Sequence, residues 1–320
     1  MTHRLAISII NYCTGPMTVE CVASVLADIG DIDAQVVVVD NASDDGSADQ
    51  IADWIADQPD GTPVRLVRSA RNTGFSGGHN QGMAAVAADH YLILNSDALL
   101  RPGFLRAILA AVDAHPQAGL IAPQIETEAG VVQVSCFRFH SPWSELIRGA
   151  RSGPVTRLLR RHVVPLEPPV DLAQIEWASF ACILLCGKMV NQIGPMDEGY
   201  FMYFEDAEYC MRARRAGWRI ALAPAAVAVH YKGGSGPVEA LGAAHKRLPS
   251  YYYSSRTRFF FQAHGRTGVF LANVMWFIGR GVACFRPFFG KPVPKSKASE
   301  AKDIWTNFAD PLGPSYAPKK

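Results

Sequence analysis

The strongest constraint on the fold is a run of four valines, Val36–Val39, that ends at Asp40. A strand without polar alternation is buried on both faces, which is typical of a parallel sheet covered by helices. The pattern predicts further strands at residues 5–11, 64–68 and 91–94, and helices at 18–27, 47–56, 82–88 and 104–114. This alternation predicts an α/β domain with a mostly parallel, Rossmann-like sheet, whose ligands bind beyond the carboxyl ends of the strands.

The rest of the chain divides into an irregular middle and an aromatic, basic end. Residues 137–169 are rich in Arg and Pro and are predicted to form a long, mobile acceptor loop. Further strands are expected at 175–186, 219–223 and 226–230, and a helix at 205–216. We expect an α/β domain over residues 1–250 and a C-terminal helical extension over 251–320, poorly ordered after Phe285.

Charge and cysteine usage exclude some classes of protein. The formal net charge is +2, which argues against nucleic acid as a partner because such proteins need a concentrated basic face. The seven cysteines include no C-x-x-C pair, so a zinc site is unexpected and thiols in the core of a cytoplasmic protein are expected. Residues 268–285 are apolar but contain Arg280, and a buried or interfacial helix is favoured over a membrane span.

Asp40 ends the valine strand and is followed by the Asx-rich segment Asn41–Ser47. A carboxylate at this position can accept the N–H of a pyrimidine base. A tight turn with a helix cap explains Ser43–Ser47 equally well, but it does not require Asp40.

A glycine-rich segment, Arg71–Gly82, follows the third predicted strand. Its four glycines would let the backbone approach a phosphate closely, and Arg71 could add a charged contact. The spacing is neither G-x-G-x-x-G nor that of a P-loop, and a flexible loop is the alternative.

The fourth predicted strand ends in Asn95-Ser96-Asp97. Side chains two residues apart can face the same way and reach a divalent cation, which would neutralise a diphosphate. An ordinary strand-end turn is the alternative.

Glu205 and Asp206 follow the apolar lead-in 200–204 at the start of a predicted helix. Acidic residues stabilise a helix N-terminus, and Glu208 with Arg212 forms an i,i+4 pair, so helix stability alone could explain the charges. The apolar lead-in favours a partly enclosed site in which a carboxylate acts as general base toward a hydroxyl.

His230 ends the last predicted strand, shortly before the segment Lys232-Gly233-Gly234-Ser235. A lone His after a strand is more often a structural residue than a ligand. The sharp bend that the two glycines allow favours a functional site instead.

Taken in order, these segments resemble the family 2 glycosyltransferases of the GT-A fold, and among them the rhamnosyltransferase-like members that build bacterial surface polysaccharides. The resemblance covers residues 4–265. The segments that carry it are Ile9–Tyr12, Val39–Ser47, Asn72–Gly78, Leu94–Asp97, Met196–Asp206, Arg214–Trp218 and the Arg/aromatic stretch Tyr251–Gly265.

The resemblance implies a role for each candidate residue. Asp206 would be the catalytic base, with Glu205 beside it; Trp177 would lie on the acceptor side; Asp97 and His230 would hold Mn²⁺ or Mg²⁺. The residues expected along the nucleotide-sugar donor are Asn11, Asp40, Asn41, Arg71, Asn72, Gly74, Asn95 and Ser96. The family inverts the anomeric centre, so the resemblance implies one in-line displacement onto a hydroxyl of a glycan or lipid-linked acceptor.

The sequence departs from the family pattern at three positions. Asn95 replaces the first carboxylate of the metal-binding D-x-D motif, so a metal would be bound weakly. Cys13 stands where relatives often carry a polar residue, and His79 interrupts the small and amide residues of the glycine segment.

Two other functions and a membrane contact stay open. A nucleotidyltransferase would need a basic, glycine-rich loop after the first strand, and Asn11–Gly15 has no basic residue. A non-catalytic sugar-nucleotide-binding protein would not need the Glu205–Asp206 pair. The aromatic and cationic residues of 251–289 suit peripheral contact with the inner face of the plasma membrane, and the alternative is a helix packed on the α/β domain.

Overall fold

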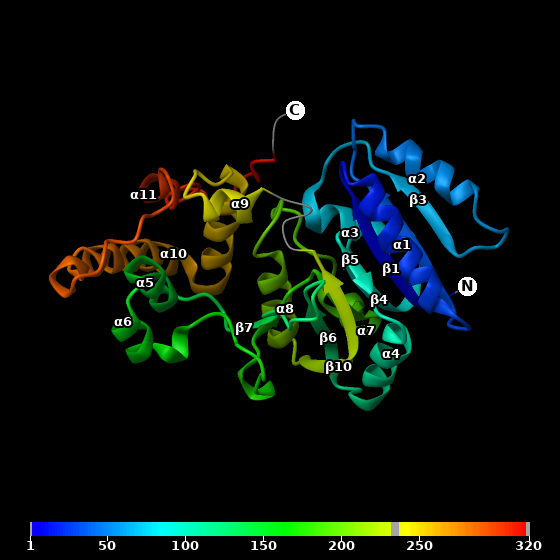
Figure 1. Cartoon of the computed structure of the whole chain (residues 1–320), viewed down its shortest axis with the longest axis horizontal. Coiled ribbons are helices and arrows are strands. Elements are labelled where there is room, and N and C mark those ends of the chain that lie inside the picture. Colours follow the sequence, from blue (N-terminus) through cyan, green and yellow to red (C-terminus); the bar gives the residue numbers. More distant parts are fainter. Residues whose placement is uncertain (1, 232–236, 318–320) are drawn as a thin grey trace.

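The computed structural model describes residues 2–231 and 237–317 (Figure 1). Lys232-Gly233-Gly234-Ser235, the bend expected after His230, lies outside the described residues. A large sheet with helices on both faces occupies one end of the molecule, and the C-terminal helices α9–α11 lie with α5 and α6 at the other end (Figure 1).

The main sheet has eight strands in the order β3-β2-β1-β4-β9-β6-β10-β5. Their bounds are β1 His3–Asn11, β2 Ala34–Asp40, β3 Val64–Arg68, β4 Ala88–Asn95, β5 Ala98–Leu100, β6 Ala118–Glu126, β9 Cys182–Cys186 and β10 Arg219–His230. A small second sheet pairs β7 (Cys136–Phe137) with β8 (Trp177–Ala178).

The sheet is mostly parallel, as predicted. Strands β3, β2, β1 and β4 run parallel, β9 is antiparallel to both β4 and β6, and β10 runs parallel to β6. The valines of β2 are fully buried, because helices cover both faces. Asn11 pairs with Asp40 and Ile10 with Asn95 in register, so the carboxyl ends of β1, β2 and β4 meet at one edge.

The helices that cover the sheet have these bounds: α1 Gly15–Ile29, α2 Ser47–Ala56, α3 Gly74–Ala84, α4 Phe104–Ala114, α7 Gly187–Ile193 and α8 Glu205–Arg215. Those of the other end are α5 Pro142–Ala150, α6 Gly153–Leu158, α9 Val238–Ala243, α10 Ser250–Ala283 and α11 Glu300–Asp303, with 3₁₀ turns η1 Arg160–His162, η2 Leu172–Gln174 and η3 Arg286–Phe289. One hydrophobic core lies between the sheet and α1, α2 and α4, and a second between its other face and α7, α8 and α10.

The glycine-rich segment is the main error of the predicted helices. A helix was expected over 82–88, but α3 spans Gly74–Ala84, and β4 already begins at Ala88. The glycines of this segment lie within α3, because the helix packs so closely on the sheet that side chains would not fit there. A Cβ on Gly78 would meet the side chain of Ile10, and one on Gly82 would meet Ser8. Close packing therefore overrides the low helix propensity of glycine.

Three strand predictions also need correction. The two strands expected at 219–223 and 226–230 are one strand, β10, with an irregularity between Ala223 and Val227. The run at 175–186 divides between β8, in the small sheet, and β9, in the main sheet. Strand β6 was not predicted, although it is largely buried.

The middle segment is structured, contrary to the predicted acceptor loop. Residues 137–169 include part of β7, helices α5 and α6, and η1. Helix α5 packs along α10 so closely that a Cβ on Gly149 would overlap the backbone of Trp276, and one on Gly279 would overlap that of Leu146 (Figure 1). The tertiary contact with α10, which the local sequence does not reveal, orders this segment.

Residues after α10 pack against the segments before them, and the poor order expected after Phe285 stays a prediction. Ile304 is fully buried, Arg247 pairs with Asp303 at 2.8 Å, and the Thr257 hydroxyl donates to the Thr306 carbonyl. These contacts tie α11 and the residues after it to α10. The division at residue 250 stays a prediction; α10 begins there, and α5 from the first part packs on it.

A buried charge network joins three of these helices. Glu145 of α5 lies 2.6 Å from Arg148 and 2.8 Å from Arg256 of α10, and Arg148 also contacts Glu300 of α11. Burial alone would raise the pKa of Glu145, but the two guanidinium groups hold it well below its ordinary value.

The cysteines were expected to be buried in the core, and this is confirmed for some of them. Four cysteines are buried (Cys21, Cys136, Cys182 and Cys210), whereas Cys13 and Cys284 are exposed, and all seven are unpaired. Across residues 2–231 and 237–317, no helix has both the length and the apolar character needed to cross a membrane.

Candidate active site

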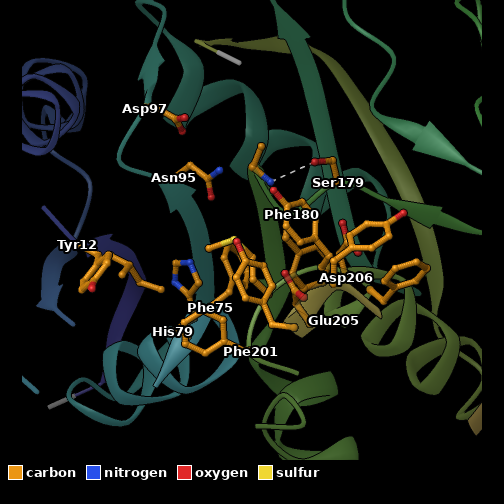
Figure 2. Close-up of a pocket in the computed structure, with 18 of the residues that line it drawn as sticks. Tyr12, Phe75, His79, Asn95, Asp97, Ser179, Phe180, Phe201, Glu205 and Asp206 are labelled. Carbon is orange, nitrogen blue, oxygen red and sulfur yellow. Dashed lines mark hydrogen bonds between the residues drawn. The ribbon is translucent and has the colours of Figure 1, made fainter. Parts of the chain in front are cut away.

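A cavity of about 720 Å³ lies at the carboxyl ends of the strands, where the fold predicts a ligand site. One side is formed by polar residues from the strand ends and the start of α3, and the other by aromatic residues and the start of α8. Figure 2 shows Asn95 at the end of β4 and Asp97 in the turn after it, with Glu205 and Asp206 across the cavity.

Asn41 and Asn72 join the end of β2 to the start of α3. The Asn41 amide donates to Asn72 Oδ1 at 3.0 Å and to the Gly74 carbonyl at 2.9 Å, and its oxygen accepts from the Thr73 N–H. Asn41, Asn72 and Gly74 all line the cavity, as expected for donor-binding residues. Their contact with a donor stays a prediction.

Three other candidate donor residues are not part of the cavity wall. Asn11 is fully buried, and its amide donates to Asp40 at 2.8 Å and to Ser47 at 2.9 Å, so it connects the ends of β1 and β2. Asp40 also accepts the N–H of Ser43. Arg71 is exposed, and neither it nor Asn11 or Asp40 is among the lining residues. A contact of these three with the donor therefore stays a prediction.

The start of the glycine segment is packed closely against the backbone of Phe201, and its contact with a phosphate stays a prediction. Gly74 has φ +71°, and a Cβ there would overlap the Phe201 carbonyl. That carbonyl accepts the N–H of Phe75 at 2.7 Å, so one of the free amides at the start of α3 is already bonded within the protein. Glycine is needed in this segment because the helix backbone lies close to the backbone of Phe201 and to side chains of the sheet.

Asp97 and His230 come together at the edge of the cavity. Nε2 of His230 lies 3.3 Å from Oδ1 of Asp97, and neither oxygen of the buried Asp97 carboxylate accepts a hydrogen bond from the described residues. A buried carboxylate without such partners fits a cation ligand, and His is a common second ligand. Within the described part of the chain, no three His, Cys, Asp or Glu side chains converge on one metal position.

Asn95, the last residue of β4, and Ser96, which follows it, also line the cavity. The Ser96 hydroxyl lies 3.2 Å from that of Thr14, at the start of α1, and the Asn95 N–H donates to Ala181 of the strand-end turn before β9. These bonds fix the turn that presents Asp97.

Glu205 and Asp206 begin α8, directly after two residues with unusual backbone angles. Tyr203 and Phe204 have φ of +72° and +68°, a left-handed conformation that costs bulky residues about 1–3 kcal/mol each. Such strain tends to occur at functional sites. Here it turns the chain sharply so that both carboxylates lie at the cavity.

Burial sets the protonation of this acidic pair. Burial raises the pKa of Asp206 to about 7, although the N–H groups of Ala207 and Phe180 offset part of the effect. Burial, and then the neighbouring charge of Asp206, raises the pKa of Glu205 well above its ordinary value. A carboxylate tuned in this way is suited to take a proton near neutral pH.

Aromatic residues form the wall beside the acidic pair. Trp177 stacks on Phe137 with ring centroids 4.1 Å apart, and its indole N–H donates to the Arg138 carbonyl at 2.9 Å. It lines the cavity, as an acceptor-side residue should. The residues that complete this wall, which the sequence analysis did not single out, are His140, Tyr203, Tyr251 and Tyr252.

The fold is similar to that of solved glycosyltransferase structures. The structure superposes on the mannosyltransferase PcManGT from Pyrobaculum calidifontis, solved in complex with GDP-Man and Mn²⁺, with a TM-score of 0.55 over 91% of this chain and 77% of that one, at 15% identity. This likeness shows the fold: an α/β glycosyltransferase architecture of the GT-A kind.

The sequence comparisons point in the same direction. Residues 6–144 match Glycosyl transferase family 2. The chain is 29% identical to the N-acetylglucosaminyl-diphospho-decaprenol L-rhamnosyltransferase of Mycobacterium tuberculosis, over 77% of this chain and 83% of that one. It is 24% identical to the rhamnosyltransferase WbbL of Escherichia coli, over 48% of this chain and 60% of that one. The chain is thus similar to family 2 glycosyltransferases, and among them to rhamnosyltransferases, as the sequence motifs predicted.

Proposed function

We propose that the protein transfers a sugar from a nucleoside diphosphate sugar to a hydroxyl of a glycan or lipid-linked acceptor, with inversion at the anomeric carbon. The observation that carries this proposal is the acidic pair Glu205–Asp206, held at the cavity opposite the ends of the parallel strands. Sugar transfer needs a base near the acceptor hydroxyl and charge stabilisation near the leaving diphosphate, and the cavity offers a candidate for each.

In the proposed reaction Asp206 accepts the proton of the acceptor hydroxyl. The acceptor oxygen bonds to the anomeric carbon as the bond from that carbon to the diphosphate oxygen breaks, and the nucleoside diphosphate leaves. Burial raises the pKa of both carboxyl groups, and the charge of Asp206 raises that of Glu205 as well, so ionisation of both groups together is disfavoured. Trp177 and the tyrosines beside it offer flat apolar faces for the acceptor.

Asp97 and His230 are the residues that would hold a divalent cation, Mn²⁺ or Mg²⁺. When bound, such a cation supplies positive charge next to the diphosphate. Because only one carboxylate and one imidazole meet at this point, donor oxygens and water would complete its coordination, and we expect weak binding in the absence of donor. Asn95, Ser96, Asn41, Asn72 and Gly74 would contact the donor.

Rhamnose is the donor sugar we propose, and a polyprenyl diphosphate-linked glycan the acceptor, on the basis of the similar enzymes named above. The protein would then act in surface polysaccharide synthesis at the inner face of the plasma membrane.

A donor screen tests this proposal. Purified protein is incubated with dTDP-rhamnose, UDP-glucose, UDP-galactose or GDP-mannose, with Mn²⁺, with Mg²⁺ or with EDTA, and released nucleoside diphosphate is measured. We expect metal-dependent release from dTDP-rhamnose in preference to the others. Release of pyrophosphate from a nucleoside triphosphate would indicate a nucleotidyltransferase instead. Donor binding in a thermal shift assay, without release in the presence of a lipid-linked acceptor, would indicate a non-catalytic binding protein.

A further inference from the structure

The outer face of α10 carries a continuous row of exposed apolar side chains. We define the outer stripe as Leu271, Phe277, Ile278, Phe285, Phe288 and Phe289. Leu271, Ile278 and Phe285 are spaced by seven residues, so they share one face of a helix, and the stripe continues into η3. Phe285, Phe288 and Phe289 are 63%, 83% and 79% exposed. Contiguous exposed apolar surface of this kind usually marks an interaction site.

The fold itself does not use the outer stripe. The opposite face of α10, with Val269, Ala272, Trp276 and Gly279, is buried, and α5 packs on it through the Gly149–Gly279 contact. The packing face and the outer stripe are therefore distinct, and removal of the most exposed phenylalanines should leave the core intact.

Positive charge lies at the end of the outer stripe. No Asp or Glu occurs between Glu239 and Glu300, and this interval contains ten Lys and Arg residues. Arg247, Arg256 and Arg258 are paired with carboxylates elsewhere, so the cations relevant to the stripe are those of η3 and the segment after it. Lys291 and Lys295 follow η3 and are exposed. Arg286 donates to the Arg151 carbonyl, which places η3 beside the junction of α5 and α6. Helix α6 ends in the exposed pair Arg157-Leu158, close to the same end of the molecule (Figure 1).

We propose that the outer stripe docks on the surface of a lipid bilayer with anionic headgroups, its phenylalanines inserted at the interface and the Lys and Arg residues of η3 and the segment after it at the headgroups. Apolar and aromatic side chains flanked by cations match the interfacial binding of peripheral proteins. A second copy of the chain fits less well. A symmetric contact through the stripe would bring the two sets of cations together, with no acidic residue of this interval to pair with them.

This inference deepens the proposed function and rests on it in one respect, namely the lipid-linked acceptor. The first half of α10 contributes Tyr251 and Tyr252 to the cavity, and the second half carries the outer stripe. The two helical segments of α10, which meet at a kink at Gly265, would thus connect the bilayer surface to the acceptor side of the active site. An acceptor anchored in that bilayer would be close to Asp206.

The experiment is flotation of the full-length protein with vesicles of phosphatidylcholine alone or mixed with phosphatidylglycerol, at low and high salt. We expect wild type to float with the anionic vesicles, and less at high salt. The triple variant F285S/F288S/F289S should lose at least about tenfold in partitioning, since three interfacial side chains are removed. K291E/K295E should weaken binding mainly at low salt. The matched control V131S/V132S removes exposed apolar side chains, 62% and 41% exposed, from a distant loop and should float as wild type does.

Two results would overturn the inference: no flotation of wild type with anionic vesicles, or equal flotation of the triple variant. Sedimentation velocity tests the alternative that a second copy of the chain covers the stripe. If wild type is a dimer and the triple variant a monomer, the stripe is a dimer contact. Donor turnover with a short-chain, soluble acceptor separates this inference from the proposed function. It should be equal in wild type and the triple variant, and its absence from both would count against the transferase proposal alone.

Discussion

Nε2 of His230, at the end of β10, lies 3.3 Å from Oδ1 of Asp97, in the turn after β4. Strands β4 and β10 are separated in the sheet by β9 and β6, so the contact bridges two distant strand ends at the cavity. His230 pairs with Ala98 of β5, the residue after Asp97, so the antiparallel pairing of β10 with β5 brings the two side chains together.

Changes at this pair should alter the metal requirement. We expect Asp97→Asn to lower kcat/KM by about 10²–10³-fold, because charge stabilisation of the leaving diphosphate is lost. Asn95→Asp should lower the Mn²⁺ concentration needed for half-maximal activity, because it restores a second carboxylate. Metal titrations of nucleoside diphosphate release measure both effects. Asp113→Asn, an exposed change on α4, is the control, and unchanged metal curves in both site variants would contradict the assignment.

The rate should depend on pH through Asp206. Burial raises the pKa of this carboxyl to about 7, and a general base acts only when deprotonated. Activity should therefore rise as pH increases through about 7 and be lost progressively below it. A profile of kcat/KM between about pH 5.5 and 8.5 measures this dependence. A rate that stays constant across this range would show that the base is not a buried carboxyl with a raised pKa.

Gly74 should be intolerant of a side chain. Its φ is +71° and a Cβ would overlap the Phe201 carbonyl, so we expect Gly74→Ala to lower the free energy of unfolding by about 3 kcal/mol or more. Gly61→Ala is the matched control, because Gly61 has φ +83° with open space around it and should cost only about 1–2 kcal/mol. Urea unfolding compares the two. Equal losses would mean that the contact with Phe201 contributes nothing beyond backbone strain.

Glu145 should contribute strongly to stability. Glu145→Gln leaves Arg148 and the fully buried Arg256 without their shared counter-charge, and we expect a loss of about 3–5 kcal/mol. Asp49→Asn breaks the exposed pair with Arg68 and should change stability by less than about 1 kcal/mol. Chemical denaturation measures both variants. If Glu145→Gln costs no more than Asp49→Asn, the network is not a stabilising contact between α5 and α10.

The parallel strands were predictable because their sequences carry an unambiguous signal. The valines of β2 are apolar at every position, and only a strand buried on both faces accommodates such a run. The polar residues at the strand ends followed from the general geometry of α/β sheets, and Asn41, Asn72, Asn95 and Asp97 do line one cavity.

Features that depend on distant contacts were not predictable in the same way. Helix α3 contains four glycines, and its extent is set by packing on β1 and β2 rather than by propensity. The ordering of 137–169 depends on α10, more than 100 residues later in the chain. The aromatic wall draws His140, Tyr203 and Tyr251 from three separate segments. The apolar lead-in 200–204 and the aromatic residues after Tyr251 were local signals for parts of it, but nothing in the sequence indicated that the three segments meet.

The measurement that tests the account most directly compares Asp206→Asn with wild type in donor binding and in turnover with an acceptor. The substitution removes the proposed base while it retains the size of the side chain. We predict unchanged affinity for the nucleoside diphosphate, measured by calorimetry, and a fall in kcat of about 10²–10⁴-fold. Turnover close to that of wild type, at unchanged donor affinity, would contradict the role of Asp206 and with it the proposed mechanism.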